Sequence, residues 1–212
     1  MAPALRRGRR IVVLCEGDTE ELAVRHFVGT QWQAEGFASV GLDPKNVNGH
    51  VRKIGILAGN FLDEGDVVAV LTLIDLQGMN LVTHESGDEL DVKVKRVRDW
   101  LSGQVEHERA HDFFPHVSVH QVEAWILAEG KALSQRLGDQ TVGPDPQAEL
   151  KNFQKPPSQR INEFFLRCKK TRYRKIIDGQ PLFSKIAFQP VYDPCRYFRA
   201  FYDDLRRVAS QA

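Results

Sequence analysis

Four acidic residues stand at positions where the chain could build a site for a divalent cation. Glu16 ends a short apolar run, and Glu20 follows it by about one helical turn. Asp75 ends a second apolar run, and Glu123 opens a predicted helix after a third. Converging carboxylates repel one another unless a positive charge lies between them. Oxygen ligands without Cys or His suit Mg²⁺ or Mn²⁺, whereas a single acid at a strand end is commonly only a helix cap or a solvated turn.

The elements around these acids are those of a parallel sheet. Residues 11–15 form an apolar run that ends near Gly17, which is typical of a strand buried on both faces. Asp18 or Thr19 can cap a following helix, whose first turn holds acidic residues where the helix dipole favours them. Because sites in open parallel sheets form beyond the carboxyl ends of the strands, we expect the acids to meet at that edge.

Strands alternate with helices along most of the chain. This order predicts an α/β fold: a three-layer, Rossmann-like, mostly parallel sheet with helices on both faces and a small helical C-terminal extension. Strands are expected at residues 11–15, 38–48, 67–74 and 114–120. Helices are expected at residues 20–36, 51–62, 89–107, 121–137, 158–167, 172–178, 181–188 and 194–208. The predicted divisions are a basic flexible arm at 1–10, an α/β core at 11–140 and a basic helical part at 141–212, packed on the core.

Charge is distributed unevenly although the formal net charge is only +1. Residues 1–150 hold 15 Lys and Arg against 23 Asp and Glu, whereas residues 151–212 hold 14 against 5. Ordinary surface patches would account for each half separately. Metal ligands in the first part and a surface that contacts phosphates in the second would account for both.

The densest basic segment is residues 167–175, with six cations in nine residues. It predicts a nucleic-acid surface formed by Lys169, Lys170, Arg172, Arg174 and Lys175. Lys175 or Lys185 could reach a scissile phosphate and stabilise charge in the transition state, so both are candidate catalytic residues. A solvated helix face is the alternative interpretation of this segment.

Other features of the sequence limit the class of protein. The three cysteines form no CxxC pair, which favours reduced thiols and a cytoplasmic location. We find no apolar run long enough to span a membrane and no secretory signal, so no membrane partner is expected. The chain has no GxxxxGK[ST] motif, so any ATP hydrolysis would come from a partner.

One segment suggests a different class of enzyme. His107-Glu108-Arg-Ala-His111 fits H-E-x-x-H, in which two His on one helix face bind zinc and Glu acts as the base. The flanking positions are charged, and Pro115 ends the segment within a turn. A zinc metalloprotease is therefore the third interpretation, behind the two that follow.

Four motifs in order resemble a known family. They are Glu16-Gly-x-Thr-Glu20, Leu73-Ile-Asp75-Leu-Gln-Gly78, Val122 to Ala128, and a tail that includes Tyr173-Arg-Lys-Ile-Ile-Asp-Gly179 and Cys195-Arg-Tyr-Phe198. Together they are similar to a group of bacterial TOPRIM-like proteins of unknown function. That group is related to the TOPRIM domain of overcoming-lysogenization-defect (OLD) nucleases.

The resemblance implies metal ligation by Glu16, Glu20, Asp75 and Glu123, with Glu16 also acting as general acid or base on a phosphodiester. It implies a Mg²⁺- or Mn²⁺-dependent nuclease that acts on DNA or RNA beside an ATPase partner in bacterial anti-phage defence; a homodimer is left open. TOPRIM nucleases usually carry Asp-x-Asp where this chain has Asp75-Leu-Gln77, so Gln77 would supply one neutral oxygen to the metal. This departure favours the second interpretation, a non-catalytic module that binds nucleic acid or an ATPase.

Overall fold

The computed structural model describes residues 8–76, 79, 88–150 and 154–212. Its centre is a sheet in the order β2-β1-β3-β4, with β5 pairing to β3 beyond β4. All four strand pairings are parallel. The strands are β1 (Arg10–Cys15), β2 (Gly41–Asn46), β3 (Val67–Asp75), β4 (Phe113–Phe114) and β5 (Val117–Ser118). The predicted α/β fold with a mostly parallel sheet is therefore confirmed.

The central strand β1 separates two hydrophobic cores. Its odd-numbered residues, such as Ile11 and Val13, belong to one core, and Val12 and Leu14 belong to the other. All four side chains are fully buried, as expected for a strand covered on both faces. Apolar residues on both sides of one strand thus fix a three-layer arrangement.

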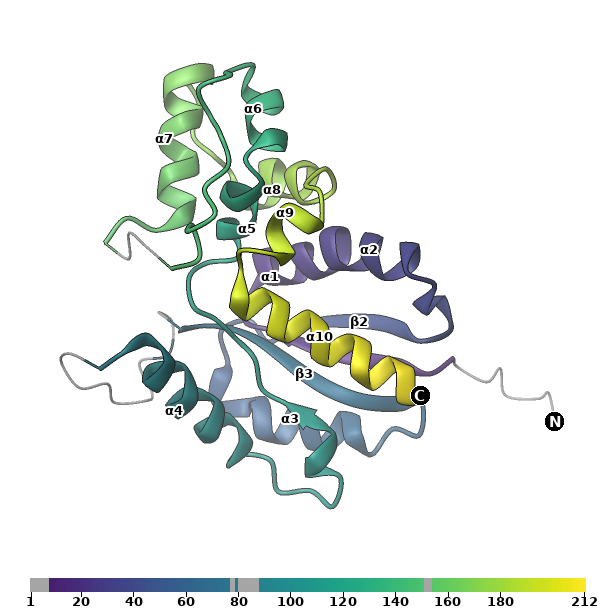
Figure 1. Cartoon of the computed structure of the whole chain (residues 1–212). Coiled ribbons are helices and arrows are strands. Elements are labelled where there is room, and N and C mark those ends of the chain that lie inside the picture. The colour runs from purple at the N-terminus through teal and green to yellow at the C-terminus, as the bar shows by residue number, and fades with distance from the viewer. Residues whose placement is uncertain (1–7, 77–78, 80–87, 151–153) are drawn as a thin grey trace.

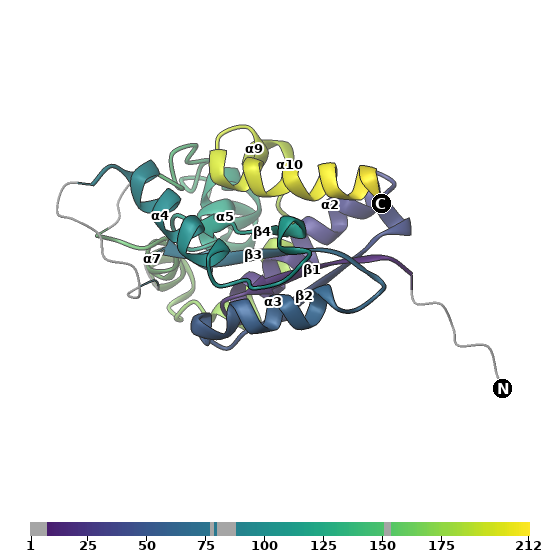
Figure 2. The same cartoon turned by 90° about the horizontal axis from the view of Figure 1, so that it is seen from below.

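Helices cover each face of the sheet (Figures 1 and 2). One face carries α1 (Asp18–Ala23), the π-helical turn η1 (Val24–Val28), α2 (Gly29–Ala34) and the long α10 (Arg196–Gln211). The other face carries α3 (Ile54–Leu62) and α4 (Leu90–Ser102). Short 3₁₀ turns are η2 (Phe37–Ser39), η3 (Val51–Lys53) and η5 (Ala110–Asp112). Figure 2 shows α10 and α3 on opposite sides of the strands.

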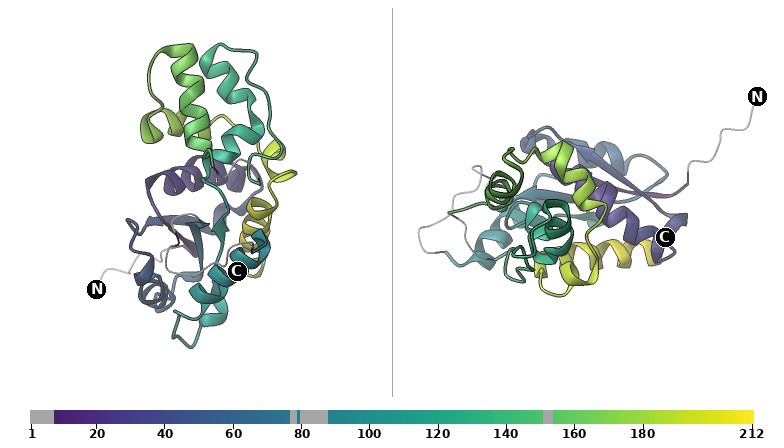
Figure 3. Two further views of the ribbon diagram at one scale, coloured as in Figure 1. Left: turned by 90° about the vertical axis from the view of Figure 1, so that its left-hand side faces the viewer. Right: turned by 90° about the horizontal axis from the view of Figure 1, so that it is seen from above.

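Four further helices stand together beyond one end of the sheet, and we call them the helical lobe (Figure 3). They are α5 (Glu123–Glu129), α6 (Lys131–Leu137), α7 (Pro157–Lys169) and α8 (Lys175–Phe183), and α9 (Gln189–Tyr192) then leads into α10. Helix α8 packs on α1, which directly follows β1. This contact places the lobe over the carboxyl end of the central strand.

Three aromatic rings join the lobe to the first face of the sheet. Trp125 of α5 lies with its centroid 4.6 Å from the ring of Phe198 and 5.9 Å from that of Phe27. Phe27 and Phe198 stack at 5.3 Å. Because these rings come from η1, α5 and α10, their burial ties distant parts of the chain into one core.

Several predicted helices differ in extent from the observed ones. The helix predicted at 121–137 is split into α5 and α6 at Gly130, whose φ is 66°. A Cβ there would lie 2.6 Å from the backbone of Gly143, so only glycine fits this break. The two helices predicted at 172–178 and 181–188 are replaced by one, α8, which contains Pro181.

The amino end of the sheet is held by ion pairs. Arg10 pairs with Asp43 at 2.5 Å, with Glu64 at 2.5 Å and with Asp66 at 2.9 Å. The predicted arm at 1–10 is therefore wrong at its last residue, because Arg10 is the first residue of β1; residues 1–7 lie outside the described part.

Cys15, Cys168 and Cys195 are free thiols. In the described ranges, none of the helices combines the length and the apolar character that crossing a bilayer would require.

Candidate acidic site at the carboxyl edge of the sheet

The side chain of Glu16 connects the ends of β1 and β3. It follows the last residue of β1, and the backbone N–H of Asp75 donates to its Oε2 at 2.8 Å. Burial raises the pKa of Glu16, this hydrogen bond opposes the shift, and the charge of Asp75 adds to it. The Glu16 side chain thus contacts the backbone of Asp75 at the end of the neighbouring strand.

Glu20 points back toward the same strand end from the first turn of α1. The backbone N–H of Gly17 donates to its Oε2 at 3.2 Å. Burial, with smaller contributions from the charges of Glu123, Asp75 and Glu16, raises the pKa of Glu20 to about 7. Since such repulsion falls off with distance, Glu20 lies within electrostatic range of the three other acids.

Glu123 is the first residue of α5 and is completely buried. Neither of its carboxylate oxygens has a hydrogen-bond partner among the described residues. The ammonium of Lys175 lies 3.4 Å from its Oε1. Burial raises the pKa of Glu123, the positive charge of Lys175 opposes the shift, and Asp75 adds to it. A buried carboxylate with unsatisfied oxygens is costly unless a positive charge compensates it.

The four acids, which we call the acidic site, suit a divalent cation by their chemistry. They offer only oxygen ligands, they repel one another, and Glu123 keeps two unsatisfied oxygens. In the described ranges, no three His, Cys, Asp or Glu side chains are already arranged to hold a metal ion. A cation would therefore draw these side chains closer together. Which of the four are ligands stays a prediction, and Gln77 lies outside the described residues.

The two candidate lysines lie at opposite ends of α8. Lys175 is its first residue and reaches Glu123. Lys185 is exposed in the turn after α8. Among the described contacts, none joins Lys185 to the acidic site, whereas Lys175 contacts Glu123.

The predicted nucleic-acid residues lie around the loop between α7 and α8. Lys169 ends α7, and Lys170 adopts a left-handed conformation with a φ of 58°. These two side chains and Arg172 are exposed. Arg174 is also exposed, but Asp178 accepts from its Nε at 3.1 Å. The segment is therefore a turn with cations directed to solvent, adjoining the acidic site at Lys175.

Sequence reasoning missed the residues that support Lys175. The backbone N–H of Arg174 donates to the buried Asp178 at 2.9 Å, which closes the start of α8. The hydroxyl of the buried Tyr173 lies where a side chain at Gly179 would have to go, 3.0 Å from a Cβ placed there. The motif Tyr173 to Gly179 contains all four of these residues, but nothing in its sequence indicates that they contact one another.

A second support lies at the end of β2. The side-chain amide of Asn46 donates to Asp18 at 2.6 Å, and the N–H of Gly49 donates to the carbonyl of Glu16 at 2.8 Å. Asn46 is the last residue of β2 and pairs with Cys15. The sequence placed a strand at 38–48 but gave no role to its end.

The H-E-x-x-H segment does not form the site it resembles. The helix predicted at 89–107 ends at Ser102, and residues 107–111 form a bend, a turn and the start of η5. His107 and His111 therefore do not share one face of an α-helix. His107 Nε2 contacts Asp63 at 3.0 Å, and His111 is exposed. The zinc-protease interpretation is wrong, because its two histidines need helical spacing.

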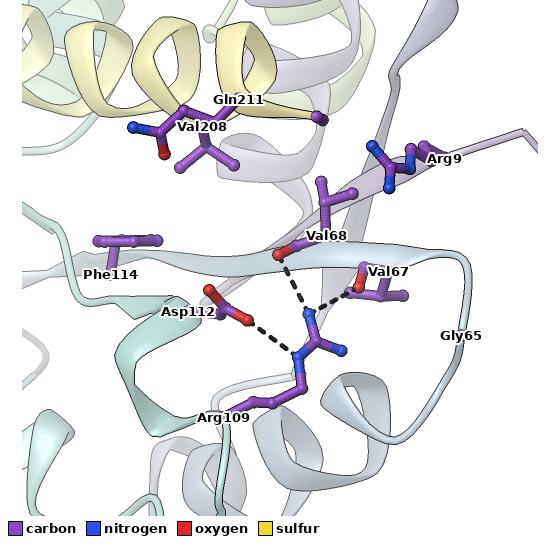
Figure 4. Close-up of a pocket in the computed structure, with 10 residues that line it drawn as sticks. Arg9, Gly65, Val67, Val68, Arg109, Asp112, Phe114, Val208 and Gln211 are labelled. Carbon is purple, nitrogen blue, oxygen red and sulfur yellow. Dashed lines mark hydrogen bonds and ion pairs between the residues drawn. The ribbon is translucent and has the colours of Figure 1, made fainter.

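A pocket of about 340 Å³ lies at the other end of the sheet, away from the acidic site (Figure 4). Its most prominent polar group is Arg109, which donates to the carbonyls of Leu62, Val67 and Val68 and to the carboxylate of Asp112. The guanidinium thus makes its hydrogen bonds to other groups of the same chain. It joins the turn after α4 to the start of β3, which makes its role structural.

Comparison with known proteins gives a family and similar solved structures, among them two C-terminal regions of OLD proteins. The C-terminal region of the Xanthomonas campestris pv. campestris OLD protein is 18% identical, with a TM-score of 0.48, over 96% of this chain and 95% of that one. The C-terminal region of the Burkholderia pseudomallei OLD protein is 15% identical, with a TM-score of 0.49, over 96% and 99%. None of the curated proteins matches the sequence. Residues 15–206, which include the four acids and Lys175, match the family described as "Domain of unknown function (DUF4276)", and the chain belongs to that family.

Proposed function

We propose that the protein is a metal-dependent nuclease that hydrolyses phosphodiester bonds of nucleic acid at the acidic site. The observation that carries the proposal is the geometry at the carboxyl edge of the sheet: Glu16 accepts from the N–H of Asp75 at 2.8 Å, and the buried Glu123 lies 3.4 Å from the ammonium of Lys175. Coupled carboxylates at the edge of a parallel sheet are a common basis for divalent-cation chemistry on phosphates. The resemblance of the four sequence motifs to TOPRIM-like proteins motivates the same reaction class.

The residues divide the work according to their contacts. The four carboxylates would hold Mg²⁺ or Mn²⁺, which supplies Lewis-acid activation of a phosphate and of the attacking water. Glu16 is placed to accept or donate the reacting proton, because it is the least buried of the glutamates in the acidic site. Lys175 would move from Glu123 toward the phosphate and stabilise negative charge there. Lys169, Lys170, Arg172 and Arg174 would contact neighbouring phosphates.

The proposal extends to a partner. The sequence contains no phosphate-binding loop, and the partner that we propose is an ATPase in bacterial defence against phage. Co-purification with an ATPase encoded beside this gene is the expected result. The proposed reaction does not depend on that partner for its chemistry.

Two observations favour a second candidate function, a non-catalytic module that binds nucleic acid. The acids of the described part are not yet arranged around a common point, and Gln77 replaces a charged ligand. A neutral amide oxygen binds a second metal ion more weakly than a carboxylate does. In that case the acidic site would have no catalytic role, and the cationic turn between α7 and α8 would bind nucleic acid.

The test compares two neighbouring glutamates of α1. Glu20→Gln removes one charge of the acidic site but keeps an oxygen for the N–H of Gly17. Glu21→Gln is the matched control, because Glu21 pairs with Arg25 at 2.7 Å. Cleavage of labelled DNA and RNA is measured with Mg²⁺ or Mn²⁺, and Mn²⁺ binding is measured separately by calorimetry.

We expect Glu20→Gln and Glu16→Ala to lose cleavage at least about 100-fold and to bind Mn²⁺ more weakly, with Glu21→Gln like wild type. Wild-type protein that binds nucleic acid but cleaves neither polymer with either metal would support the non-catalytic module. Cleavage that survives both site variants would refute the acidic site as its origin.

A further inference from the structure

Two adjacent isoleucines at the start of α8 face solvent. Ile176 is 43% exposed and Ile177 is 59% exposed, whereas Leu182 and Phe183 on the other side of the helix are buried. Exposed apolar residues are common singly, but two in succession beside a candidate site call for a functional explanation.

The surroundings of this pair are cationic. Lys169, Lys170 and Arg172 precede it within eight residues, and all three are exposed. Within the described part of the chain, no carboxylate forms an ion pair with any of them, although Lys170 donates to the carbonyl of Arg167 at 3.3 Å. These three cations, Ile176 and Ile177 are called the basic-aliphatic rim below. Such a surface offers free positive charge next to apolar contact area.

The rim is fixed to the acidic site by one residue. Lys175 lies between Arg172 and Ile176 in the chain, and its ammonium is 3.4 Å from Glu123. A polymer that places a phosphate near Lys175 would therefore lay its neighbouring units across the rim. Helix α8 is held in this position by its packing on α1 and by the bond from Arg174 to Asp178.

We propose that the basic-aliphatic rim binds an unpaired nucleic-acid strand, with the cations on its phosphates and Ile176 and Ile177 against exposed base faces. Charge complementarity selects a polyanion, since three exposed cations, which form no ion pair within the described ranges, precede the apolar pair in the chain. The isoleucines select the strand type, because the faces of stacked and paired bases in a duplex interior are covered. This inference rests on the proposed function for the reaction, and it adds the class of substrate.

The test separates apolar contact from charge. Fluorescence anisotropy measures binding of a labelled oligothymidine of about 20 nucleotides, and of a blunt duplex of similar length, in EDTA so that nothing is cleaved. The variants are Ile176→Ser with Ile177→Ser, and Lys169→Gln with Arg172→Gln. Ile56→Ser is the matched control. Ile56 is 69% exposed, but it lies on α3, which covers the opposite face of the sheet from α10.

We expect the double isoleucine variant to bind the single strand about tenfold more weakly, with little change for the duplex. Its slope of log affinity against log salt should equal that of wild type, because no charge has changed. The Lys169 and Arg172 variant should weaken both ligands and reduce that slope by about 1 to 2. Ile56→Ser should behave as wild type, and all variants should melt at the wild-type temperature.

Three outcomes would overturn the inference. They are wild-type affinity of the isoleucine variant for the single strand, equal losses for strand and duplex, and no measurable binding of either nucleic acid. The last would also be expected if the rim instead contacts an acidic protein. Failure of the proposed nuclease function gives a different result. If the isoleucine variant loses single-strand binding but not duplex binding, and the wild type cleaves neither polymer, this inference stands and only the nuclease proposal is refuted. If the wild type cleaves nucleic acid but the isoleucine variant binds strand and duplex as the wild type does, the nuclease proposal stands and this inference is refuted.

Discussion

The ammonium of Lys175 lies 3.4 Å from Oε1 of the fully buried Glu123. The first residue of α8 is thereby the counter-ion of the first residue of α5. A cation at the acidic site would compete with this lysine for the same carboxylate. Glu123 would therefore pair with Lys175 when the site holds no cation, and with the cation when one is bound.

Replacing Lys175 should destabilise the protein only when no metal is present. In EDTA, Lys175→Gln leaves the Glu123 charge uncompensated, and we expect the free energy of unfolding to fall by about 1 kcal/mol, a value kept small because the lysine is partly exposed. Saturating Mn²⁺ should remove most of the difference, since ligand binding stabilises the folded state. Chemical denaturation with and without Mn²⁺ measures both effects. Lys185→Gln is the control, and an equal loss with Mn²⁺ would contradict the competition.

Gly179 and Tyr173 should be energetically coupled. A Cβ at Gly179 would lie 3.0 Å from the Tyr173 hydroxyl, so Gly179→Ala gains helix propensity but meets that oxygen. In a Tyr173→Phe background the obstacle is gone, and the alanine should be more favourable by about 1 kcal/mol than in wild type. A double-mutant cycle from urea denaturation measures the coupling. A coupling energy near zero would show that the hydroxyl simply moves aside.

Glu149 should make stability depend on pH. Its carboxylate accepts the N–H groups of Tyr197 and Phe198 at 3.1 Å, and burial raises its pKa to about 7. The folded state therefore binds more protons than the unfolded state between about pH 4.5 and 7, and this group's contribution to stability falls as pH rises through that window. Relative to wild type, Glu149→Gln should gain up to about 1.4 kcal/mol per pH unit there. A stability difference that stays constant from pH 5 to 7 would exclude this linkage.

The packing of α3 against the segment after α4 should tolerate no side chain at Gly55. A Cβ there would meet the backbone oxygen of Gln104 at 1.9 Å, so α3 and the segment after α4 would have to separate. We expect Gly55→Ala to cost about 2 to 4 kcal/mol of stability. Gly59→Ala, one turn later in α3, is the control, because its Cβ would come no closer than 3.9 Å to His107. That control should be neutral or stabilising by up to about 1 kcal/mol, and similar losses at both sites would contradict close packing at Gly55.

Local patterns in the sequence were sufficient for β1 and β3 and for the acids at their ends, whereas the strand predicted at 114–120 is divided into β4 and β5. Apolar runs ending at Glu16 and Asp75 predicted buried strands, and the structure has β1 and β3 there with both acids at their carboxyl ends. Such runs are informative because burial on both faces requires an unbroken apolar segment. The boundaries of helices were less predictable. The break at Gly130 depends on the backbone of Gly143, which no local pattern indicates.

The sequence by itself determined the α/β fold, the strands that end beside Glu16 and at Asp75, and the dense basic segment at 167–175. Only the tertiary structure decided which distant residues make contact. It pairs Lys175 with Glu123 and His107 with Asp63. It also places the hydroxyl of Tyr173 beside Gly179. Hydrophobic periodicity is a property of neighbours in the chain, so it can be read directly from the residues. Contacts between distant residues depend on how whole helices pack, and many side chains compete for each partner until packing selects one.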